Sequence, residues 1–225
     1  MSLVFVILGA IALALYIPEK IRGYTVKAVI LKSIVSVLFI AVAVSAGSRS
    51  KLAPFIIMGL VFGLLGDIWL DLKYVFPEHD AVFTYAGFAM FGIGHIIYVT
   101  GLILQFQGGP FLAVSFALAA ASAAAVGILE KPMKLTYGKM KPIVIIYGLM
   151  LFSTVFVSGG MLLTKGGTPL LIIFIGAASF AISDLVLSGT YFGTGKDRPV
   201  DIISNYIFYY AGQFLIAYSL VLLQE

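Results

Sequence analysis

The segment PFIIMGLVFGLLGDIWL, residues 54–70, is apolar throughout except for Asp67 near its end. About 20 apolar residues form a helix long enough to cross the roughly 30 Å hydrocarbon layer of a bilayer. A second segment, IIFIGAASFAISDLVL at residues 172–187, has the same character and carries Asp184. Because a carboxylate in a membrane span costs about 2.5–3.5 kcal/mol on insertion scales, each aspartate is expected to have a partner, a water-filled cavity or a chemical role.

The composition of the whole chain indicates the same class of protein. Of the 225 residues, 61% are hydrophobic and 11% are charged, whereas soluble domains are about 45–50% apolar and about 25% charged. The polar connections are too short to hold a soluble domain, so residues 1–225 are predicted to form a single integral membrane domain of the all-α class. The chain has no cysteine, which excludes disulfides and thiolate chemistry. Its net charge of +4 is interpreted as a topology signal, and no nucleic-acid partner is expected.

Apolar runs predict a polytopic bundle of eight transmembrane helices. The first is expected to end before Pro18, and Pro54, Pro110, Pro142 and Pro169 each fall in the first turn of a span, where proline is tolerated. The predicted spans are residues 2–17, 27–46, 53–72, 83–106, 110–129, 142–163, 169–189 and 201–223.

The distribution of basic residues predicts the orientation in the cell (plasma or inner) membrane. With eight spans, both termini lie on one side, and the loops on that side carry Arg49, Lys51 and Lys165. The opposite loops carry ten basic residues, with Lys32 just inside the second span as an eleventh: Lys20, Arg22, Lys27, Lys73, Lys131, Lys134, Lys139, Lys141, Lys196 and Arg198. The positive-inside rule then places both termini outside the cell.

The two aspartate segments can be aligned with each other. Placing Gly59 on Gly176 brings Asp67 onto Asp184, Leu70 onto Leu187 and Tyr74 onto Tyr191. Four spans per half preserve direction, so the chain allows two parallel repeats of four helices. The alternative is a chance match between apolar helices of similar composition.

Both aspartates are predicted to lie at one depth, in the cytoplasmic half of the membrane. Asp67 follows Ala53 by 14 residues and Asp184 follows Pro169 by 15, which places each about 20 Å along its helix. Asp71 lies one turn further along, near the interface and Lys73, and is expected to have a supporting role. Six other polar residues are expected to converge on the same cavity: His95, Tyr98, Ser183, Asn205, Tyr209 and Gln213.

The structural alternative for these residues is that they only hold helices together. Each aspartate could pair with a lysine, tyrosine or histidine, with Lys32 and His95 as candidate partners, and the amides and tyrosines are often helix contacts. Only two histidines occur and no H-E-x-x-H motif is present, so no metal site and no cofactor is predicted. A structure that kept the aspartates far apart, or sealed one of them against a lysine away from any cavity, would contradict a shared site.

The motifs in this order resemble those of the YhhN family of eight-span proteins, which includes the animal lysoplasmalogenases. The motifs cover spans three, four, seven and eight: GDIWL at 66–70, GF at 87–88 with His95 and Tyr98, SDLVL at 183–187, and YYAGQFLI at 209–216. The resemblance implies a lysophospholipid substrate whose vinyl-ether bond is hydrolysed to a fatty aldehyde and a glycerophospho-headgroup. It also implies that Asp67 and Asp184 are the catalytic carboxylates, while His95 and Gln213 match further family positions.

Carboxylates suit this reaction, because a vinyl ether hydrolyses by protonation at carbon and capture of the oxocarbenium ion by water. Two carboxyl groups in different environments can divide the acid and base roles, and the sequence leaves open which aspartate is the acid. The alternative function is a transporter or lipid-binding protein that uses the aspartates for proton or cation coupling. An intramembrane aspartyl protease is a further alternative, although Gly63-Leu64-Leu65-Gly66-Asp67 has one residue too many for its G-x-G-D motif. Membrane lipids are the other expected partners, and the sequence does not define the oligomeric state.

Overall fold

The computed structural model describes residues 1–23, 25–194 and 198–223, and these form helices joined by short connections. Lys196, one of the residues used for the topology prediction, lies outside the described residues. The helices are α1 (Ser2–Arg22), α2 (Val26–Ser45), α3 (Ala53–Val75), α4 (Asp80–Phe106), α5 (Phe111–Ile128), α6 (Lys141–Lys165), α7 (Thr168–Phe192) and α8 (Pro199–Leu222), with short 3-10 turns at Pro77–His79 and Gly138–Met140.

Proline and polar residues mark several of the helix starts. Pro54, Pro142 and Pro169 each occupy the first turn of their helices, where the absent N–H group has no intrahelical partner to lose. Pro110 instead precedes α5, which starts at Phe111. The Thr25 hydroxyl caps α2 by accepting a hydrogen bond from the Ala28 N–H, 3.3 Å away, as is typical of an N-cap threonine.

The first helix is longer than predicted. It continues through Pro18 to Arg22, so the expected end before Pro18 is wrong, and Lys20 is not a loop residue. Only 5% of Lys20 is exposed, because its ammonium group forms an ion pair with Asp71 of α3 at 2.8 Å. The last turn of α1 is therefore bound to the bundle rather than released into a loop.

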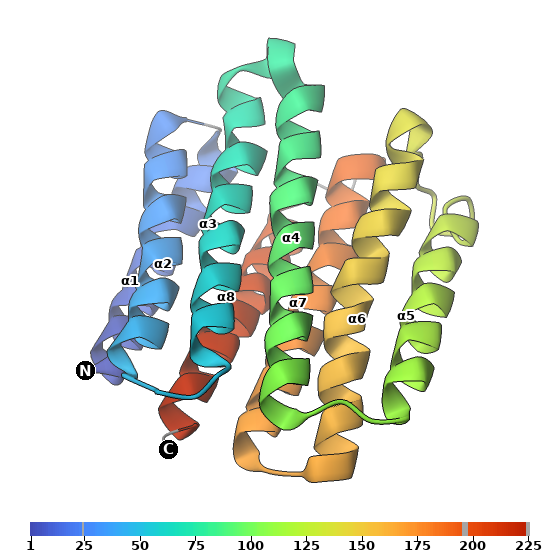
Figure 1. The fold of residues 1–225 in the computed structure, drawn as a ribbon. Helices are drawn as coiled ribbons and strands as arrows, with labels where there is room; N and C mark the ends of the chain where they lie inside the picture. The colour runs from blue at the N-terminus through green and yellow to red at the C-terminus, as the bar shows by residue number, and fades with distance from the viewer. Residues whose placement is uncertain (24, 195–197, 224–225) are drawn as a thin grey trace.

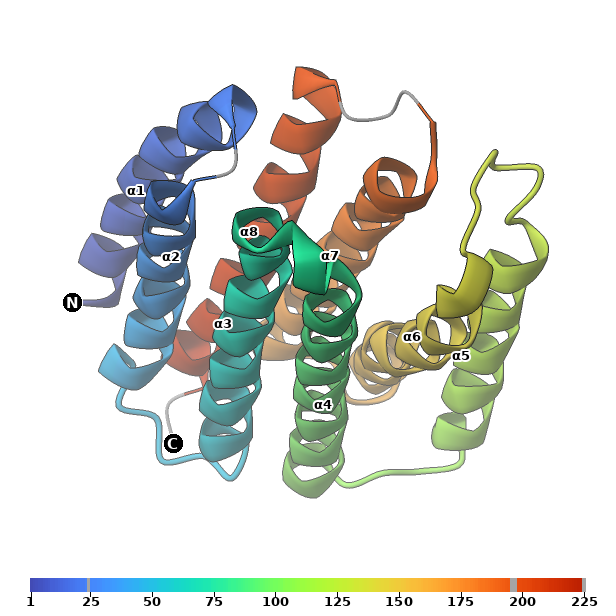
Figure 2. The same ribbon diagram turned by 90° about the horizontal axis from the view of Figure 1, so that it is seen from above.

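The helices form two central layers, with a further pair of helices on each side. Helices α3 and α4 lie in front of α8 and α7, with α1 and α2 on one flank and α6 and α5 on the other (Figures 1 and 2). Both termini lie at the same end of the bundle, which agrees with an even number of helices (Figure 1).

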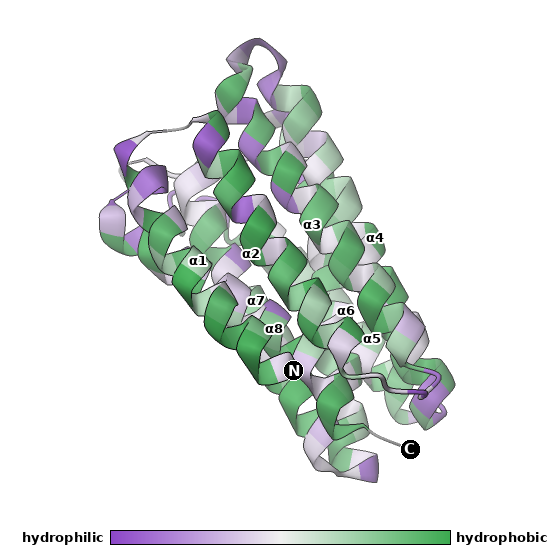
Figure 3. Cartoon of the chain, turned by 90° about the vertical axis from the view of Figure 1, so that its left-hand side faces the viewer, coloured by the Kyte–Doolittle hydropathy of each residue, from purple (hydrophilic) through white to green (hydrophobic). Residues whose placement is uncertain are grey.

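Most of the bundle has the surface of a membrane protein. Seven of the described helices, α1 to α7, are long and apolar enough to cross a bilayer. Apolar residues cover the length of the helices, and polar residues gather at the two ends (Figure 3). Helix α8 carries Asn205, Gln213 and several tyrosines along its length, so its crossing stays a prediction, as does the orientation of the bundle in the membrane.

The packing of the two halves is alike. If α1–α4 and α5–α8 are compared as halves, α6 corresponds to α2 and α8 corresponds to α4. Helix α2 packs against α8, and α6 packs against α4. A Cβ atom on Gly94 would lie 3.1 Å from the Gly59 carbonyl oxygen, and one on Gly212 would lie 2.7 Å from the Gly176 carbonyl oxygen. Two equivalent halves would make such matching contacts, although the repeat in the sequence stays a prediction.

The contact between Gly176 and Gly212 sets the distance between α7 and α8, which both line the pocket described below. Replacing Gly212 with alanine is expected to destabilise the protein by about 1–3 kcal/mol, because the new methyl group would meet backbone atoms that cannot move aside. Gly148→Ala is the matched control, since its Cβ would have ordinary contacts of 3.7 Å or more. Thermal unfolding in detergent measures the difference, and equal midpoints for both variants would contradict the close approach.

Candidate active site

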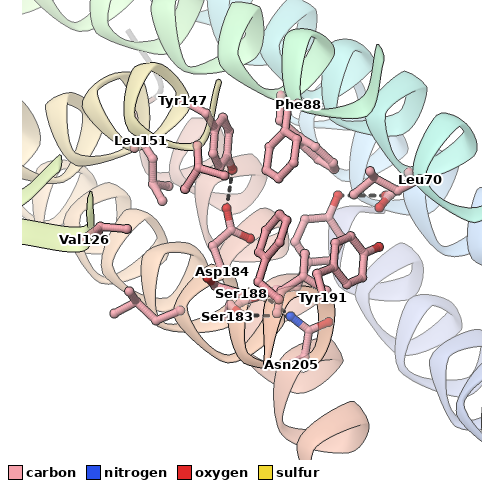
Figure 4. A pocket seen from close by; sticks show the side chains of 18 of the residues that line it. Leu70, Phe88, Val126, Tyr147, Leu151, Ser183, Asp184, Ser188, Tyr191 and Asn205 are labelled. Atoms are coloured by element: carbon pink, nitrogen blue, oxygen red, sulfur yellow. Dashed lines mark hydrogen bonds between the residues drawn. The ribbon is translucent and has the colours of Figure 1, made fainter. Parts of the chain in front are cut away.

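Asp67 and Asp184 line the same pocket, which lies between α3, α4, α6, α7 and α8 (Figure 4). Each aspartate precedes the C-terminal residue of its helix by eight residues, or about 12 Å, so the two occupy corresponding positions along α3 and α7, and their depth in the membrane stays a prediction. The pocket contains about 840 Å³ of space not filled by atoms, including its open part. Its wall is mostly apolar and includes Leu70, Phe88 and Leu151.

Asp67 is a buried carboxylate with a full set of donors. Its Oδ1 lies 3.2 Å from the Lys32 ammonium group. Its Oδ2 accepts hydrogen bonds from Ser36 at 2.6 Å and from Tyr209 at 2.7 Å. An adjacent cation and two hydroxyl donors all favour the ionised form of this carboxyl group.

Asp71 lies one turn from Asp67 and shares its lysine. Asp71 Oδ1 accepts from Lys20 at 2.8 Å and from Lys32 at 3.2 Å, while its Oδ2 accepts from the Tyr16 hydroxyl at 3.1 Å. Only 3% of Asp71 is exposed, and its ion pairs are with Lys20 and Lys32, while its nearness to the membrane interface stays a prediction. Asp71 does not line the pocket.

These four residues balance in charge. Lys20 and Lys32 supply two positive charges, and Asp67 and Asp71 supply two negative charges. All four are at most 5% exposed. A buried charge without a partner is strongly destabilising, so the ion pairs offset the cost of burying both carboxylates in a largely apolar helix bundle.

Asp184 has a different environment. One of its carboxyl oxygens accepts a short hydrogen bond from the Tyr147 hydroxyl, and the other turns away from Tyr147 (Figure 4). Within the described part of the chain, no ion pair involves Asp184. The structure therefore places one aspartate with a lysine and the other with a tyrosine in one pocket.

Ser183 and Asn205 also reach the pocket, as predicted, and they bind each other. The Asn205 side-chain amide nitrogen donates to the Ser183 carbonyl oxygen at 2.8 Å and to the Ser183 hydroxyl oxygen at 2.9 Å. Both residues line the wall beside Asp184. These bonds join α8 to α7 next to the carboxyl group.

Tyr98, Gln213 and Tyr209 form a hydrogen-bonded chain that ends on Asp67. The Tyr98 hydroxyl donates to the Gln213 amide oxygen at 3.2 Å, and the Gln213 amide nitrogen donates to the Tyr209 hydroxyl at 3.2 Å. Of the three, only Tyr209 lines the pocket. Tyr98 and Gln213 therefore act on Asp67 through Tyr209, and the expectation that they face the cavity is corrected.

His95 also lies behind the pocket wall. Its ring is 4.8 Å from that of Phe180 and 6.0 Å from that of Tyr147, and its Nδ1 lies 3.1 Å from the Thr154 hydroxyl. It is not among the pocket-lining residues. The prediction that His95 converges on the cavity is therefore wrong for direct contact, because α4 turns this side chain toward α6 and α7.

Two important partners of the aspartates, Tyr147 and Ser36, were hard to identify from the sequence. Tyr147 is an isolated polar group in an apolar span and Ser36 is one of several serines in its helix, so neither carries a motif. The position of Ser36 four residues after Lys32 was the available signal, since residues at this spacing share a helix face. No group of side chains suited to a metal ion occurs within residues 1–23, 25–194 and 198–223.

The connection between α5 and α6 is bound to the pocket end of α7. The Tyr137 hydroxyl lies 3.2 Å from the Ser188 hydroxyl, and the Thr136 N–H donates to the Phe192 carbonyl at 2.8 Å. Within this connection, the hydrogen bond from Lys141, at 2.8 Å, lowers the pKa of the Glu130 carboxyl. Because Ser188 and Phe192 line the pocket, these bonds hold part of its wall in place.

Comparison with known proteins identifies the family. No curated protein and no solved structure matches the chain. The model of the YhhN family matches residues 27–220, which include both aspartates, Lys32 and the other pocket-lining residues. Since this segment is well over half of the chain, the protein belongs to the YhhN family.

Proposed function

We propose that this protein is a membrane-embedded hydrolase that cleaves the vinyl-ether bond of a lysoplasmalogen. The observation that carries the proposal is the pair of unlike carboxyl groups in one apolar pocket. Asp67 pairs with the Lys32 cation, whereas Asp184 pairs with no cation among residues 1–23, 25–194 and 198–223. Membership of a family that includes lysoplasmalogenases supports it. An apolar wall suits a single hydrocarbon chain, and an acid–base pair suits the reaction of its first double bond.

Asp184 is the proposed general acid. A buried carboxyl group without a cation is more stable neutral than ionised, so Asp184 can carry the proton that the reaction needs. Tyr147 fixes one carboxyl oxygen and leaves the other turned away from it (Figure 4). The proton passes to the alkenyl carbon that is not bonded to oxygen, and an oxocarbenium ion forms at its neighbour.

Asp67 is the proposed stabilising anion and base. Its negative charge, maintained by Lys32, Ser36 and Tyr209, faces the cation that forms in the pocket. Water adds to the oxocarbenium carbon and gives its proton to a carboxylate, which leaves a hemiacetal. The hemiacetal then loses its hydroxyl proton as the carbon–oxygen bond to glycerol breaks, and the glycerol oxygen takes up a proton. One water is consumed, and an aldehyde and a glycerophospho-alcohol are released.

Lys73 is the proposed contact for the phosphate of the headgroup. It lies two turns beyond Asp67 on α3, with its ammonium group 3.5 Å from the centre of the Tyr191 ring, and Tyr191 lines the pocket. Its ion-pair partner Asp80 is 3.7 Å away and 58% exposed, so this pair is weak and a phosphate can compete for the lysine. The hydrocarbon chain then extends inward past Leu70 and Phe88.

Proton- or cation-coupled transport is the alternative proposal. The buried aspartates would serve it as well, but Lys32 already occupies the position beside Asp67 that a transported cation would take. Proton-coupled flux in proteoliposomes without any aldehyde product would favour transport over hydrolysis.

Asp67→Asn and Asp184→Asn are each expected to reduce aldehyde release by at least about 100-fold, the lower end of a general acid–base contribution. Purified protein is incubated with choline and ethanolamine lysoplasmalogens, and the aldehyde is quantified. Saturated-ether analogues are the substrate control, since they have no double bond to protonate. Glu78→Gln, which changes an exposed carboxylate, is the variant control. Full activity in either aspartate variant would contradict the two-carboxylate mechanism.

Tyr147→Phe is expected to move the alkaline limb of the pH–rate profile to higher pH. The tyrosine donates a hydrogen bond to the Asp184 carboxylate, and a bond to the charged form favours ionisation. Without it, Asp184 keeps its proton to higher pH, and the rate at the optimum falls because the carboxyl group is less well oriented. An unchanged or lowered alkaline limb would argue against Asp184 as the acid.

Lys73→Met is expected to raise KM for lysoplasmalogens by about 10-fold, as for the loss of one charge-assisted hydrogen bond, with little change in kcat. The matched substrate is a 1-alkenylglycerol, which has the same vinyl ether but no phosphate, and its KM is expected to stay the same. A similar loss with both substrates would show that Lys73 supports the fold rather than the headgroup.

A further inference from the structure

Lys32 bridges two carboxylates, and only one of them belongs to the pocket. Its ammonium nitrogen lies 3.2 Å from Asp67 Oδ1 and 3.2 Å from Asp71 Oδ1. Lys32 and Asp67 line the pocket, whereas Asp71 and Lys20 do not. Asp71 therefore competes with Asp67 for the shared lysine from outside the cavity.

Helix α1 determines how strongly Asp71 competes. Lys20 donates to Asp71 Oδ1 at 2.8 Å, which is closer than Lys32, and Tyr16 donates to its other oxygen at 3.1 Å. Lys20 also lies 4.4 Å from the centre of the Tyr74 ring, and the Tyr16 ring packs edge-on against Tyr206 at 4.9 Å. The end of α1 is thus held against α3 and α8.

We propose that α1, through Lys20 and Tyr16, is a positioning element of the site: by satisfying Asp71, it leaves Lys32 available to Asp67. The proposal deepens the proposed function, because it names what controls the charge of the pocket carboxylate. Helix α1 precedes the segment that the family model matches, residues 27–220, so family membership does not assign this role.

The strength of the effect follows from burial. Lys20, Lys32, Asp67 and Asp71 are all at most 5% exposed, so salt and water screen their interactions little. An opposite charge within about 4–6 Å changes the proton affinity of a carboxyl group by about one to three pH units. The titratable groups around Asp67 come from four helices: Lys32 (α2), Asp71 (α3), Asp184 (α7), and Tyr209 and Tyr210 (α8).

Two substitutions are expected to have opposite effects on Asp67. Lys20→Met leaves Asp71 without its closer cation, so Lys32 shifts toward Asp71 and Asp67 takes up a proton more easily. The acid limb of the pH–rate profile then moves to higher pH by about one unit or more. Asp71→Asn frees Lys32 for Asp67 and moves the acid limb to lower pH. A purely structural role of α1 would not produce shifts of opposite sign.

The double variant Lys20→Met with Asp71→Asn keeps the test decisive if a single variant folds poorly. It removes one charge of each sign and leaves the Lys32–Asp67 pair, so its acid limb is expected to return to within a few tenths of a unit of the original. Lys27→Met is the matched control, because it removes a lysine that is 66% exposed and paired with Glu19 at 2.9 Å. Shifts of the same sign in both single variants, or a double variant that stays shifted, would overturn the proposal.

An infrared titration separates this inference from the proposed function. The carbonyl stretch of protonated Asp67 is identified by its loss in Asp67→Asn, and its pH midpoint is compared between the original protein, Lys20→Met, Asp71→Asn and the double variant. The expected order is the same as in the pH–rate profiles, and it requires no substrate. Opposite shifts of the midpoint without any vinyl-ether hydrolysis would overturn the proposed function and support the role of α1. Hydrolysis with an unchanged midpoint would support the proposed function and overturn the role of α1.

Discussion

The ion pairs of Lys32 with Asp67 and Asp71 are the constraint on which the site depends. Burying one carboxylate among apolar helices is unfavourable, and burying two of them one turn apart on α3 is more so. One lysine from α2 and one from α1 offset both charges, with hydroxyl donors from Tyr16, Ser36 and Tyr209. Helices α1, α2, α3 and α8 are thereby tied together, and the position of α3 in the bundle is fixed by charge as well as by packing.

This cluster is balanced in charge within itself, and among the described residues no cation pairs with Asp184. That difference makes the pocket asymmetric: an anion supported by a lysine lies on α3, and a carboxyl group bound by a tyrosine lies on α7. An acid and a base at one site need such unlike environments. Lys32 and Tyr147 come from α2 and α6, the helices that precede the two aspartate helices along the chain. Similar packing with different polar residues thus gives the two carboxyl groups different chemistry.

The supporting residues around Asp67 form layers behind the pocket wall. Tyr98 and Gln213 reach the carboxylate through the Tyr209 hydroxyl, and Lys20 reaches it through Asp71 and Lys32. Close contacts between glycines, Gly59 with Gly94 and Gly176 with Gly212, bring the backbones near enough for these chains to form. The close helix contacts and the polar network therefore depend on each other, because small residues on one face of a helix allow the hydrogen bonds on another face to form.

The sequence alone determined the class of fold, the approximate helices and the meeting of the two aspartates at one site. Apolar runs and their prolines predicted the helices, and the rise per residue predicted that Asp67 and Asp184 lie at one level. It also supplied Lys32 as a candidate partner and the family resemblance. These features follow from composition and spacing within single segments.

Only the tertiary structure decided which polar groups meet. The sequence placed Lys20 in a loop, whereas the fold buries it against Asp71, 51 residues away in the chain. The fold turns His95, Tyr98 and Gln213 away from the cavity, and it places Tyr147 in the cavity wall. The physical reason is that the rotation of each helix and its choice of neighbours depend on the packing of all the helices together. Within one apolar span, the hydrophobicity is nearly the same on every face, so the sequence of that span does not show which face turns inward.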